Sequence, residues 1–335
     1  MEANEAFSRL DALSKLNVVK DYSRVRSKTV VIVGVGGVGS VAAEMLVRCG
    51  VKKLILFDYD RVELANMNRM FFTPAQVGLS KVDAAVETLQ RICQGSVEIR
   101  GFNCNVCSID GYHQLKSQLV NSRQDPTHGS ETLLLCCVDN YAARITVNRL
   151  CLDLQQIWLE SGVAETAMSG HVQCMFPGVS ACFECAPPCV VAEAGDEKII
   201  VRPGVCAASL PTTMSIVAGM LVQTALKLLL AFGKVNGFVG YDGLSDYMPV
   251  YEIRPNPDCV NEACKILQSV HSKPEEVVCP RVPEPDITST KPSNAWGIEV
   301  QDSGCIPNVT GGTITGTSDH QDASLGDLME RLKRR

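Results

Sequence analysis

Several separate stretches of the chain carry residue types suited to chemistry on a phosphate. A glycine-rich loop, Gly34-Val-Gly36-Gly37-Val-Gly39, follows the apolar run Thr29–Val33. Glycines let a backbone approach a phosphate closely, and a helix opening at Gly39 would offer free N–H groups and the positive end of its dipole. Polar and charged residues that could complete such a site follow at Asp58, Asn66, Asn68, Arg69, Lys81, Asp139 and Asn140. Two cations and a carboxylate able to hold Mg²⁺ suit attack on a nucleotide phosphate better than hydride transfer.

The glycine loop alone does not decide between these two chemistries. The motif occurs most often in oxidoreductases that bind a dinucleotide, where an acid such as Asp58 binds the ribose hydroxyls. That acid serves ATP equally well. Arg69 and Lys81 discriminate better, because a nicotinamide enzyme needs no cationic cluster just beyond the second strand. The competing interpretation of these two cations is a solvated helix face.

Two closely spaced cysteine pairs, Cys182-x-x-Cys185 and Cys259-x4-Cys264, predict a second site. Four thiolates in two such pairs can close a tetrahedral zinc site, and nearby prolines are expected to keep both pairs on non-helical turns. No ligand position would remain for a substrate, so the predicted role is structural. The alternative is four unrelated buried cysteines.

Another cysteine, Cys206, lies in the small-residue segment Arg202-Pro-Gly-Val-Cys206-Ala-Ala-Ser-Leu-Pro211, just before a long apolar stretch. A thiol near Arg202 and a helix N-terminus is expected to be a better nucleophile than a buried one. Spacing alone leaves Cys189 as an alternative. The histidines form no triad, and His171 is interpreted as a satisfied core residue, not a base.

A βαβ unit must position the glycine loop. The pattern predicts a strand at 30–33, the helix Gly39–Cys49 and a strand at 54–57. Further elements are expected as helices at 80–93, 142–154 and 212–232, and as strands at 132–137, within 163–176 (antiparallel), and near 235–241 and 247–253. The predicted fold class is therefore α/β, Rossmann-like, with a mainly parallel sheet and helices on both faces.

Composition bounds the remaining possibilities. The chain has 335 residues, 46% of them hydrophobic, which is enough to bury a full core, and a net charge of −6 argues against a nucleic-acid partner held by electrostatics. No positively flanked apolar segment opens the chain, and 16 cysteines then favour a reducing compartment. The long apolar stretch contains Gln223 and Lys227 and is interpreted as a buried helix, not a membrane span.

Composition changes after the compact part, which is expected to cover 1–268. Residues 269–323 are rich in Pro, Ser, Thr and Gly and are predicted to form a flexible linker. An interaction motif is predicted at 295–300, where Trp296, Ile298 and Val300 alternate as in a strand. The segment 324–335 predicts an amphipathic, partner-binding helix with its apolar face at Leu325, Leu328, Met329 and Leu332.

Together these motifs resemble the adenylating enzymes that activate ubiquitin-like proteins and their bacterial sulfur-carrier relatives, over about 1–268. By motif, the resemblance implies ATP contacts from Gly37, Asp58, Arg69, Lys81, Asn105 and Asn140, with Asp139 as the magnesium ligand. Phe7-Ser8-Arg9 is similar to a family motif whose arginine reaches the partner subunit's nucleotide. Cys206 matches the family's thioester cysteine, and Zn²⁺ would be bound by Cys182, Cys185, Cys259 and Cys264.

The resemblance also implies partners and a location. The modifier's C-terminus would be adenylated, passed to Cys206 and then transferred to a conjugating enzyme, by a homodimer. The 295–300 motif would bind the modifier, and an autophagy-type ubiquitin-like protein is a second expected ligand. The implied location is the cytoplasm, with the nucleus and the surface of the endoplasmic reticulum as further places.

Three other functions compete with this one. A sulfur-carrier adenylyltransferase would share the ATP chemistry and the zinc, but it has no need of the Trp296 motif or the terminal helix. A zinc-containing NAD dehydrogenase usually carries its glycine loop after a catalytic domain. A non-enzymatic scaffold is disfavoured, because Asp58, Arg69, Lys81 and Asp139 are all present.

Overall fold

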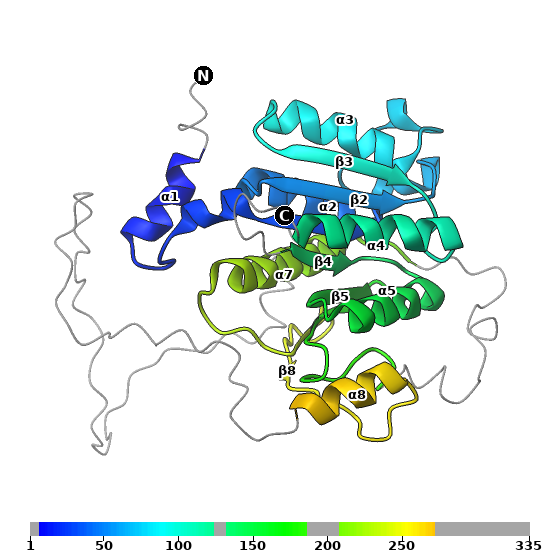
Figure 1. The fold of residues 1–335 in the computed structure, drawn as a ribbon. Helices are drawn as coiled ribbons and strands as arrows, with labels where there is room; N and C mark the ends of the chain where they lie inside the picture. The colour runs from blue at the N-terminus through cyan, green and yellow to red at the C-terminus, as the bar shows by residue number, and fades with distance from the viewer. Residues whose placement is uncertain (1–6, 124–131, 186–207, 272–335) are drawn as a thin grey trace, which may run out of the picture. The chain divides into compact units, whose positions relative to one another are not determined.

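A computed structural model describes residues 7–123, 132–185 and 208–271, and within them eight strands form one sheet (Figure 1). The order across the sheet is β3-β2-β1-β4-β5-β6-β7-β8. The strands are β1 Thr29–Val33, β2 Lys53–Asp58, β3 Glu98–Asn103, β4 Thr132–Cys136, β5 Trp158–Val163, β6 Ser169–Met175, β7 Phe238–Asp242 and β8 Val250–Tyr251. The first five strands in this order, from β3 across to β5, run parallel to one another. The last three, β6, β7 and β8, each pair antiparallel with the strand before them.

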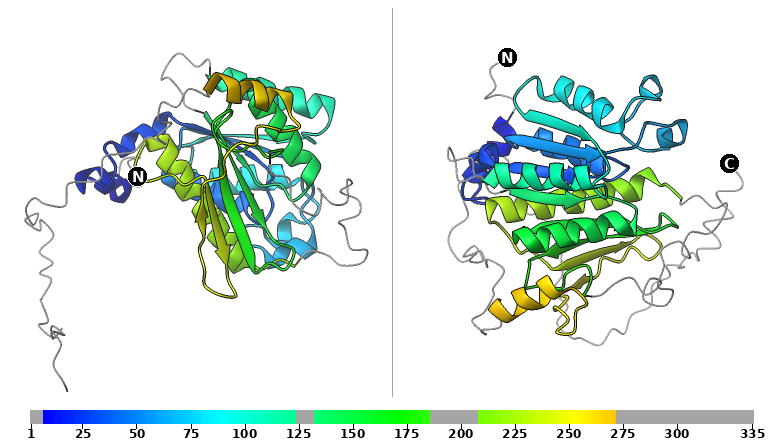
Figure 2. Two further views of the ribbon diagram at one scale, coloured as in Figure 1. Left: turned by 90° about the horizontal axis from the view of Figure 1, so that it is seen from below. Right: turned by 45° about the vertical axis from the view of Figure 1, so that its right-hand side comes forward.

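Helices cover both faces of the sheet (Figure 2). One layer joins α2 (Gly39–Cys49), α3 (Lys81–Cys93) and α7 (Pro211–Leu230), whose apolar side chains meet Val30, Ile32, Leu54 and Leu56 of the sheet. The other joins α4 (Ile109–Arg123) and α5 (Tyr141–Leu154) against Val31, Val33, Ile55 and Phe57. β1 is buried along its whole length, which explains its unbroken apolar sequence.

The remaining elements lie around this three-layer core. α1 (Ser8–Lys15) contacts the short 3₁₀ helix η1 (Tyr22–Ser27), and η2 (Leu64–Asn68) and η3 (Pro74–Gln76) lie between β2 and α3. α8 (Glu262–His271) packs on α5. α7 is long and apolar enough to cross a membrane, with a mean hydropathy of 1.6, but it is a core helix because it contacts α2, β5 and β6.

The predicted fold class is confirmed, and three details differ. The antiparallel pair expected within 163–176 is formed by β5 and β6, so it begins earlier, at Trp158. β3 and α4 occupy a region for which no element was expected, because β3 has only half-buried or exposed side chains and a weak apolar pattern. Cys264 belongs to α8, so the turn expected there is the start of a helix. The segments predicted within 272–335 lie outside the described residues.

Candidate active site and metal centre

The glycine loop lies at the carboxyl edge of the parallel strands, where the strand order reverses between β1 and β4. Gly34 has a positive φ of 93°, and a Cβ there would lie 2.7 Å from the carbonyl oxygen of Cys137, which directly follows β4. A Cβ on Gly39 would collide with the carbonyl of Gly34, so the first turn of α2 packs directly on the loop. The sequence therefore builds a crevice at the position where open α/β sheets bind ligands.

Asp58, at the end of β2, joins the loop to the next strand. Its Oδ2 accepts a hydrogen bond from Val35 N–H over 2.6 Å, and its Oδ1 accepts one from Asp60 N–H over 2.8 Å. Burial raises the pKa of this carboxyl above its ordinary value, although the nearby charge of Lys81 opposes the shift. Asp58 thus holds the glycine loop and still faces the crevice.

Two cations line the same crevice from the connection between β2 and α3. Lys81 is the first residue of α3, is only 7% exposed, and its Nζ lies 2.7 Å from Oδ2 of Asp60. Arg69 follows η2, and its Nη1 lies 3.7 Å from the position of a Cβ on Gly36. Arg69 is therefore next to backbone that can hold a phosphate, and Lys81 lines the same cavity.

The end of β4 supplies the polar residues on the other side of the glycine loop. Asp139 is exposed there, and Asn140 is the N-cap of α5, with its Oδ1 accepting from Ala143 N–H over 2.8 Å. Asn105 follows β3, and its Oδ1 accepts from Cys107 N–H over 2.9 Å. One exposed carboxylate suits Mg²⁺, which commonly uses few protein ligands together with waters and substrate phosphates.

These residues line one cavity of about 1240 Å³. The seven residues that the family resemblance implies for this chain's own ATP and magnesium line it: Gly37, Asp58, Arg69, Lys81, Asn105, Asp139 and Asn140. Asn66 and Asn68, which were also expected at the phosphate site, do not line it, because Asn66 accepts a hydrogen bond from Glu63 N–H and Asn68 donates one to the carbonyl of Ser209. The cavity continues past β4 to a second end formed by β5, β6 and β7, which includes Gly162, His171 and Tyr241. It therefore has room for a nucleotide and for a second reactant beside it.

Other predicted site residues lie elsewhere. Arg9 is exposed on α1 and does not line this cavity. Cys206 and Cys189 lie outside the described residues, as do the expected tail ligands Trp296, Ile298, Val300, Leu325, Leu328, Met329 and Leu332. The segment after Cys206 is described from Ala208 onward, and Ala208 lines the cavity and donates its N–H to the carbonyl of Glu165 over 2.8 Å.

The four paired cysteines come together as a second centre. The Sγ atoms of Cys182, Cys185, Cys259 and Cys264 are all buried and lie within 4.8 Å of one another. Cys182 and Cys259 are 3.8 Å apart, and Cys185 and Cys264 are 3.6 Å apart. Four sulfurs around Zn²⁺ at about 2.3 Å each would be separated by roughly 3.8 Å. The donor set and its spacing therefore fit a tetrahedral zinc ion.

Neighbouring groups favour thiolates at this centre. The backbone N–H of Asn256 donates to Cys185 Sγ over 3.4 Å, that of Asn261 donates to Cys259 Sγ over 3.5 Å, and Gln268 Nε2 donates to Cys264 Sγ over 3.3 Å. The hydrogen bond between Cys182 and Cys185 lowers the pKa of Cys185 below its ordinary value and raises that of Cys182, and burial raises the pKa of Cys259. Such donors are typical of the surroundings of metal-binding sulfur.

Glu184, inside the first cysteine pair, joins the metal centre to α5. Its carboxylate accepts from Asn148 Nδ2 over 2.9 Å, from Asn261 Nδ2 over 2.6 Å and from Arg149 Nη2 over 2.8 Å. Burial would raise the pKa of this carboxyl, but these bonds hold it below its ordinary value. Through Glu184, the metal centre is connected to α5, which Asn140 caps, and to Asn261, which directly precedes α8.

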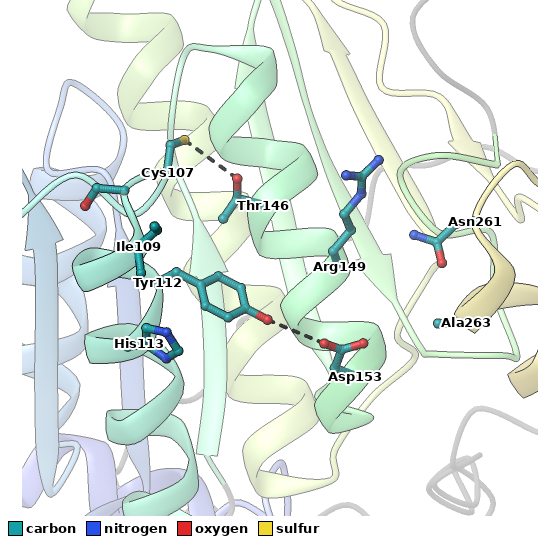
Figure 3. Close-up of a pocket in the computed structure, with 10 residues that line it drawn as sticks. Cys107, Ile109, Tyr112, His113, Thr146, Arg149, Asp153, Asn261 and Ala263 are labelled. Atoms are coloured by element: carbon teal, nitrogen blue, oxygen red, sulfur yellow. Dashed lines mark hydrogen bonds between the residues drawn. The ribbon is translucent and has the colours of Figure 1, made fainter.

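A second hollow, of about 580 Å³, lies between α4, α5 and α8 (Figure 3). Tyr112 donates its hydroxyl to Asp153 over 3.4 Å and Thr146 donates to Cys107 Sγ over 3.7 Å, both on this surface. It has no glycine loop, and Arg149, one of its cations, is paired with Glu184. The nucleotide chemistry therefore belongs to the larger cavity.

The sequence analysis missed a buried group behind the wall of that cavity and misinterpreted a residue that lines it. Glu160 of β5 is completely buried, and one of its oxygens lies 2.6 Å from Nε2 of His171. His171 is not a core residue, because its side chain is 32% exposed and lines the cavity. An acid in an otherwise apolar strand, Trp158-Leu-Glu160, was the available signal, since a buried charge needs a partner.

Comparisons with known proteins show the family and the fold of the chain. A model of the ThiF family matches residues 8–261. A Bombyx mori protein named ubiquitin-like modifier-activating enzyme 5 is 46% identical over 98% of this chain and 88% of its own length. An Arabidopsis thaliana protein of the same name is 50% identical over 88% of this chain and 71% of its own length. A crystal structure of E. coli MccB with ATP shares the fold, with a TM-score of 0.58 and 19% identity over 71% of this chain and 68% of that one.

Proposed function

We propose a two-step reaction on the premise that this chain belongs to the ThiF family and, within it, to the ubiquitin-like modifier-activating enzyme 5 group. The chain is an activating enzyme for a ubiquitin-like modifier and has an ATP-using adenylation fold. The finer assignment is ours: the modifier is a ubiquitin-fold modifier, its C-terminus is adenylated in the large cavity, and Cys206 then receives it as a thioester.

In the first step, an oxygen of the modifier's terminal carboxylate attacks the α-phosphorus of ATP. The bond from that phosphorus to the bridging oxygen breaks, and pyrophosphate leaves. Arg69 and Lys81 offset the negative charge that gathers on the phosphate oxygens, and the N–H groups of the glycine loop add to this effect. Mg²⁺, when bound at Asp139, would neutralise further charge on the phosphates. Asp58 and Asn105 would bind the nucleoside part.

In the second step, the Cys206 thiolate attacks the carbonyl carbon of the mixed anhydride. A carbon–sulfur bond forms, and AMP leaves with the electron pair of the broken carbon–oxygen bond. The acyl group stays activated and passes to a cysteine of a conjugating enzyme. Ala208, two residues beyond Cys206, lines the cavity, which supports a short path between the two steps.

The observation that carries this proposal is the meeting of all seven nucleotide-site residues, drawn from separate elements, in one cavity. The cysteine centre supports a structural Zn²⁺, since four cysteines leave no position for a reactant. We further propose a homodimer in which Arg9 reaches the partner's nucleotide. An autophagy-type ubiquitin-like protein is proposed as a second ligand of the 295–300 motif.

The test is modifier-dependent exchange of labelled pyrophosphate into ATP, followed by detection of an adduct on the chain that thiols release. Both are expected with a ubiquitin-fold modifier, ATP and Mg²⁺. Exchange that never yields a thiol-labile adduct would favour the sulfur-carrier alternative. No exchange with any ubiquitin-like protein would refute the proposal.

A further inference from the structure

A pair of cysteines lies between a strand and a helix of the parallel sheet, and the proposed reaction uses neither thiol. Cys104-Asn105-Val106-Cys107 directly follows β3, and only Ser108 separates it from α4. Both cysteines are free, and neither belongs to the cluster of four sulfurs. Two cysteines at this spacing, between a parallel strand and the helix that follows it, are typical of a redox-active dithiol. The position of the pair therefore predicts thiol chemistry, not metal binding.

The two thiols face different hollows. Cys104 is half-buried and lines the large cavity. Cys107 is exposed, lines the second hollow and accepts a hydrogen bond from Thr146 Oγ1 over 3.7 Å (Figure 3). Burial raises the pKa of the Cys104 thiol above its ordinary value. A reagent in solution therefore meets Cys107 first, and Cys104 is the thiol placed behind it.

A tight turn connects the two cysteines. The carbonyl of Asn105 accepts a hydrogen bond from Ser108 N–H over 3.0 Å, and its Oδ1 accepts one from Cys107 N–H over 2.9 Å. Such a turn brings the Cα atoms at its two ends to within about 7 Å, and each cysteine directly precedes one of these ends. A disulfide joins Cα atoms that are roughly 4.4–6.8 Å apart. Rotation of the Cys107 side chain away from Thr146, with a small shift of the turn, is therefore enough to close a bridge.

The turn also holds a residue of the nucleotide cavity. Asn105 lies between the two cysteines and lines the cavity, where it is a proposed contact of the nucleoside. A Cβ on Gly111 would collide with the carbonyl of Asn105, so the first turn of α4 packs directly on this backbone. Because α4 restricts the backbone on that side, the shift that closes a bridge falls on the Asn105 side chain and its bond to Cys107 N–H. Closing a bridge therefore changes the wall of the nucleotide cavity.

We propose that Cys104 and Cys107 form a reversible disulfide by exchange with a small-molecule disulfide, and that this bridge weakens nucleotide binding through Asn105. The inference goes beyond the proposed function, and only its effect on the nucleotide rests on the contact assigned there to Asn105. A reducing compartment keeps the pair as thiols and the cavity competent for ATP. Oxidation closes the bridge and slows adenylation.

The exchange balances with glutathione disulfide as the oxidant. The Cys107 thiolate attacks one of its sulfur atoms, the sulfur–sulfur bond breaks, and one glutathione leaves as a thiolate. The Cys104 thiol then gives its proton to water and attacks Cys107 Sγ, and the second glutathione leaves with the electron pair of the bond that breaks. Two protein thiols are thereby oxidised to one disulfide, and one glutathione disulfide is reduced to two glutathione molecules.

The modification can be read directly by mass spectrometry. Cleavage after Arg100 and Lys116 releases one peptide, 101–116, that contains Cys104 and Cys107 and no other cysteine. In folded, full-length chain equilibrated with glutathione disulfide, this peptide should lose two hydrogens and resist alkylation until dithiothreitol restores both thiols. Cys107→Ser should not form the bridge. Cys93→Ser is the matched control and should form it as the wild type does, because Cys93 lies on α3 and does not line the cavity.

Nucleotide binding provides the second measurement. With Mg²⁺ present, the bridge should raise the Kd for ATP roughly two- to tenfold, as expected for the loss of one hydrogen bond. The same treatment should leave the Kd of Cys107→Ser unchanged, which separates this pair from every other thiol of the chain. Because the linkage between two binding events is reciprocal, saturating ATP should raise the concentration of glutathione disulfide needed for half-closure by the same factor.

The outcomes separate this inference from the proposed function. Two alkylated cysteines, or a glutathione that stays on Cys107, would overturn the disulfide. A closed bridge with an unchanged Kd for ATP would overturn its control of nucleotide binding. If Cys107→Ser does not fold, Cys104→Ser decides instead, since it should retain glutathione on Cys107. Reduced wild-type chain without modifier-dependent exchange would refute the proposed function and leave the mapped disulfide standing.

Discussion

Arg69 Nε donates a hydrogen bond to Ser209 Oγ over 3.3 Å, and this contact joins the phosphate side of the cavity to the segment that follows the proposed thioester cysteine. Asn68 strengthens the connection, because its Nδ2 donates to the carbonyl of Ser209 over 2.9 Å. Ser209 is three residues beyond Cys206 and two before α7. The guanidinium is thereby aimed with its Nη groups over the glycine loop.

Ser209→Ala should therefore slow adenylation modestly. The guanidinium would lose one of the contacts that orient it, worth about 0.5–1.5 kcal/mol, so the exchange rate should fall roughly two- to tenfold. Ser117→Ala is a suitable control, because its hydroxyl bonds within α4 to the carbonyl of Gln114, away from Arg69. Equal exchange rates in the two variants would show that the contact does not orient Arg69 for catalysis.

Cys206→Ser should separate the two steps. Adenylation needs the nucleotide cavity, whereas transfer needs a sulfur nucleophile, so exchange should persist and the thiol-labile adduct should disappear. Any adduct formed by the serine should resist thiols. Cys189→Ser serves as the matched variant and should behave as wild type. Should Cys206→Ser keep the labile adduct while Cys189→Ser loses it, the nucleophile is Cys189.

Lys81→Ala and Asp139→Ala should each abolish exchange and everything that follows it. Either change removes a charge set against the phosphates, a loss of about 3 kcal/mol or more and so at least roughly 100-fold in rate. Asp153→Ala is the control for loss of a carboxylate, since Asp153 is exposed in the second hollow, between α4, α5 and α8. Wild-type exchange in either test variant would remove that residue from the proposed site.

The metal centre should matter for stability more than for chemistry. Purified chain should contain about one zinc per chain by elemental analysis, and Cys182→Ala should lose that zinc and melt at a lower temperature. Exchange measured well below the melting transition should remain, because the cysteines are not part of the cavity lining. Cys93→Ala, outside both the cluster and the cavity lining, should keep its zinc and its exchange activity. Metal-free chain with an unchanged melting temperature would contradict the structural role.

The sequence predicted the βαβ core, and it predicted a set of polar residues that the structure brings to one cavity, because both signals are local. A glycine loop after an apolar run, and cations at fixed distances beyond it, can be recognised without tertiary contacts. The close spacing within each cysteine pair was likewise enough to predict that the four cysteines form one cluster. The helix that contains Cys264 was not predicted. The helix was missed because two prolines before Cys259 mark a turn that ends just before α8 begins.

Tertiary pairing explains what could not be predicted. Glu160 and His171 pair across neighbouring antiparallel strands although they are eleven residues apart, and Arg144 reaches Glu160 from α5. The contact from Arg69 to Ser209 joins residues 140 positions apart. Periodicity does not show which residues pair, even where one member, such as Glu160 in an apolar strand, stands out in the sequence.

The tail should act after, or beside, the chemistry of the cavity. The alternation of Trp296, Ile298 and Val300 suits a strand added to the edge of a partner's sheet, and the Leu325, Leu328, Met329 and Leu332 face suits a helix in a groove. Deleting 324–335 should therefore leave thioester formation on Cys206 intact and slow transfer to the conjugating enzyme.

Trp296→Ala should instead weaken modifier binding, measured by titration calorimetry, because it removes the side chain that would fill a pocket. Trp158, the second tryptophan, is buried in the core and is no control, so Ile314→Ala in the linker is the matched change. Transfer and binding both at wild-type values would leave these two segments without a role in the reaction.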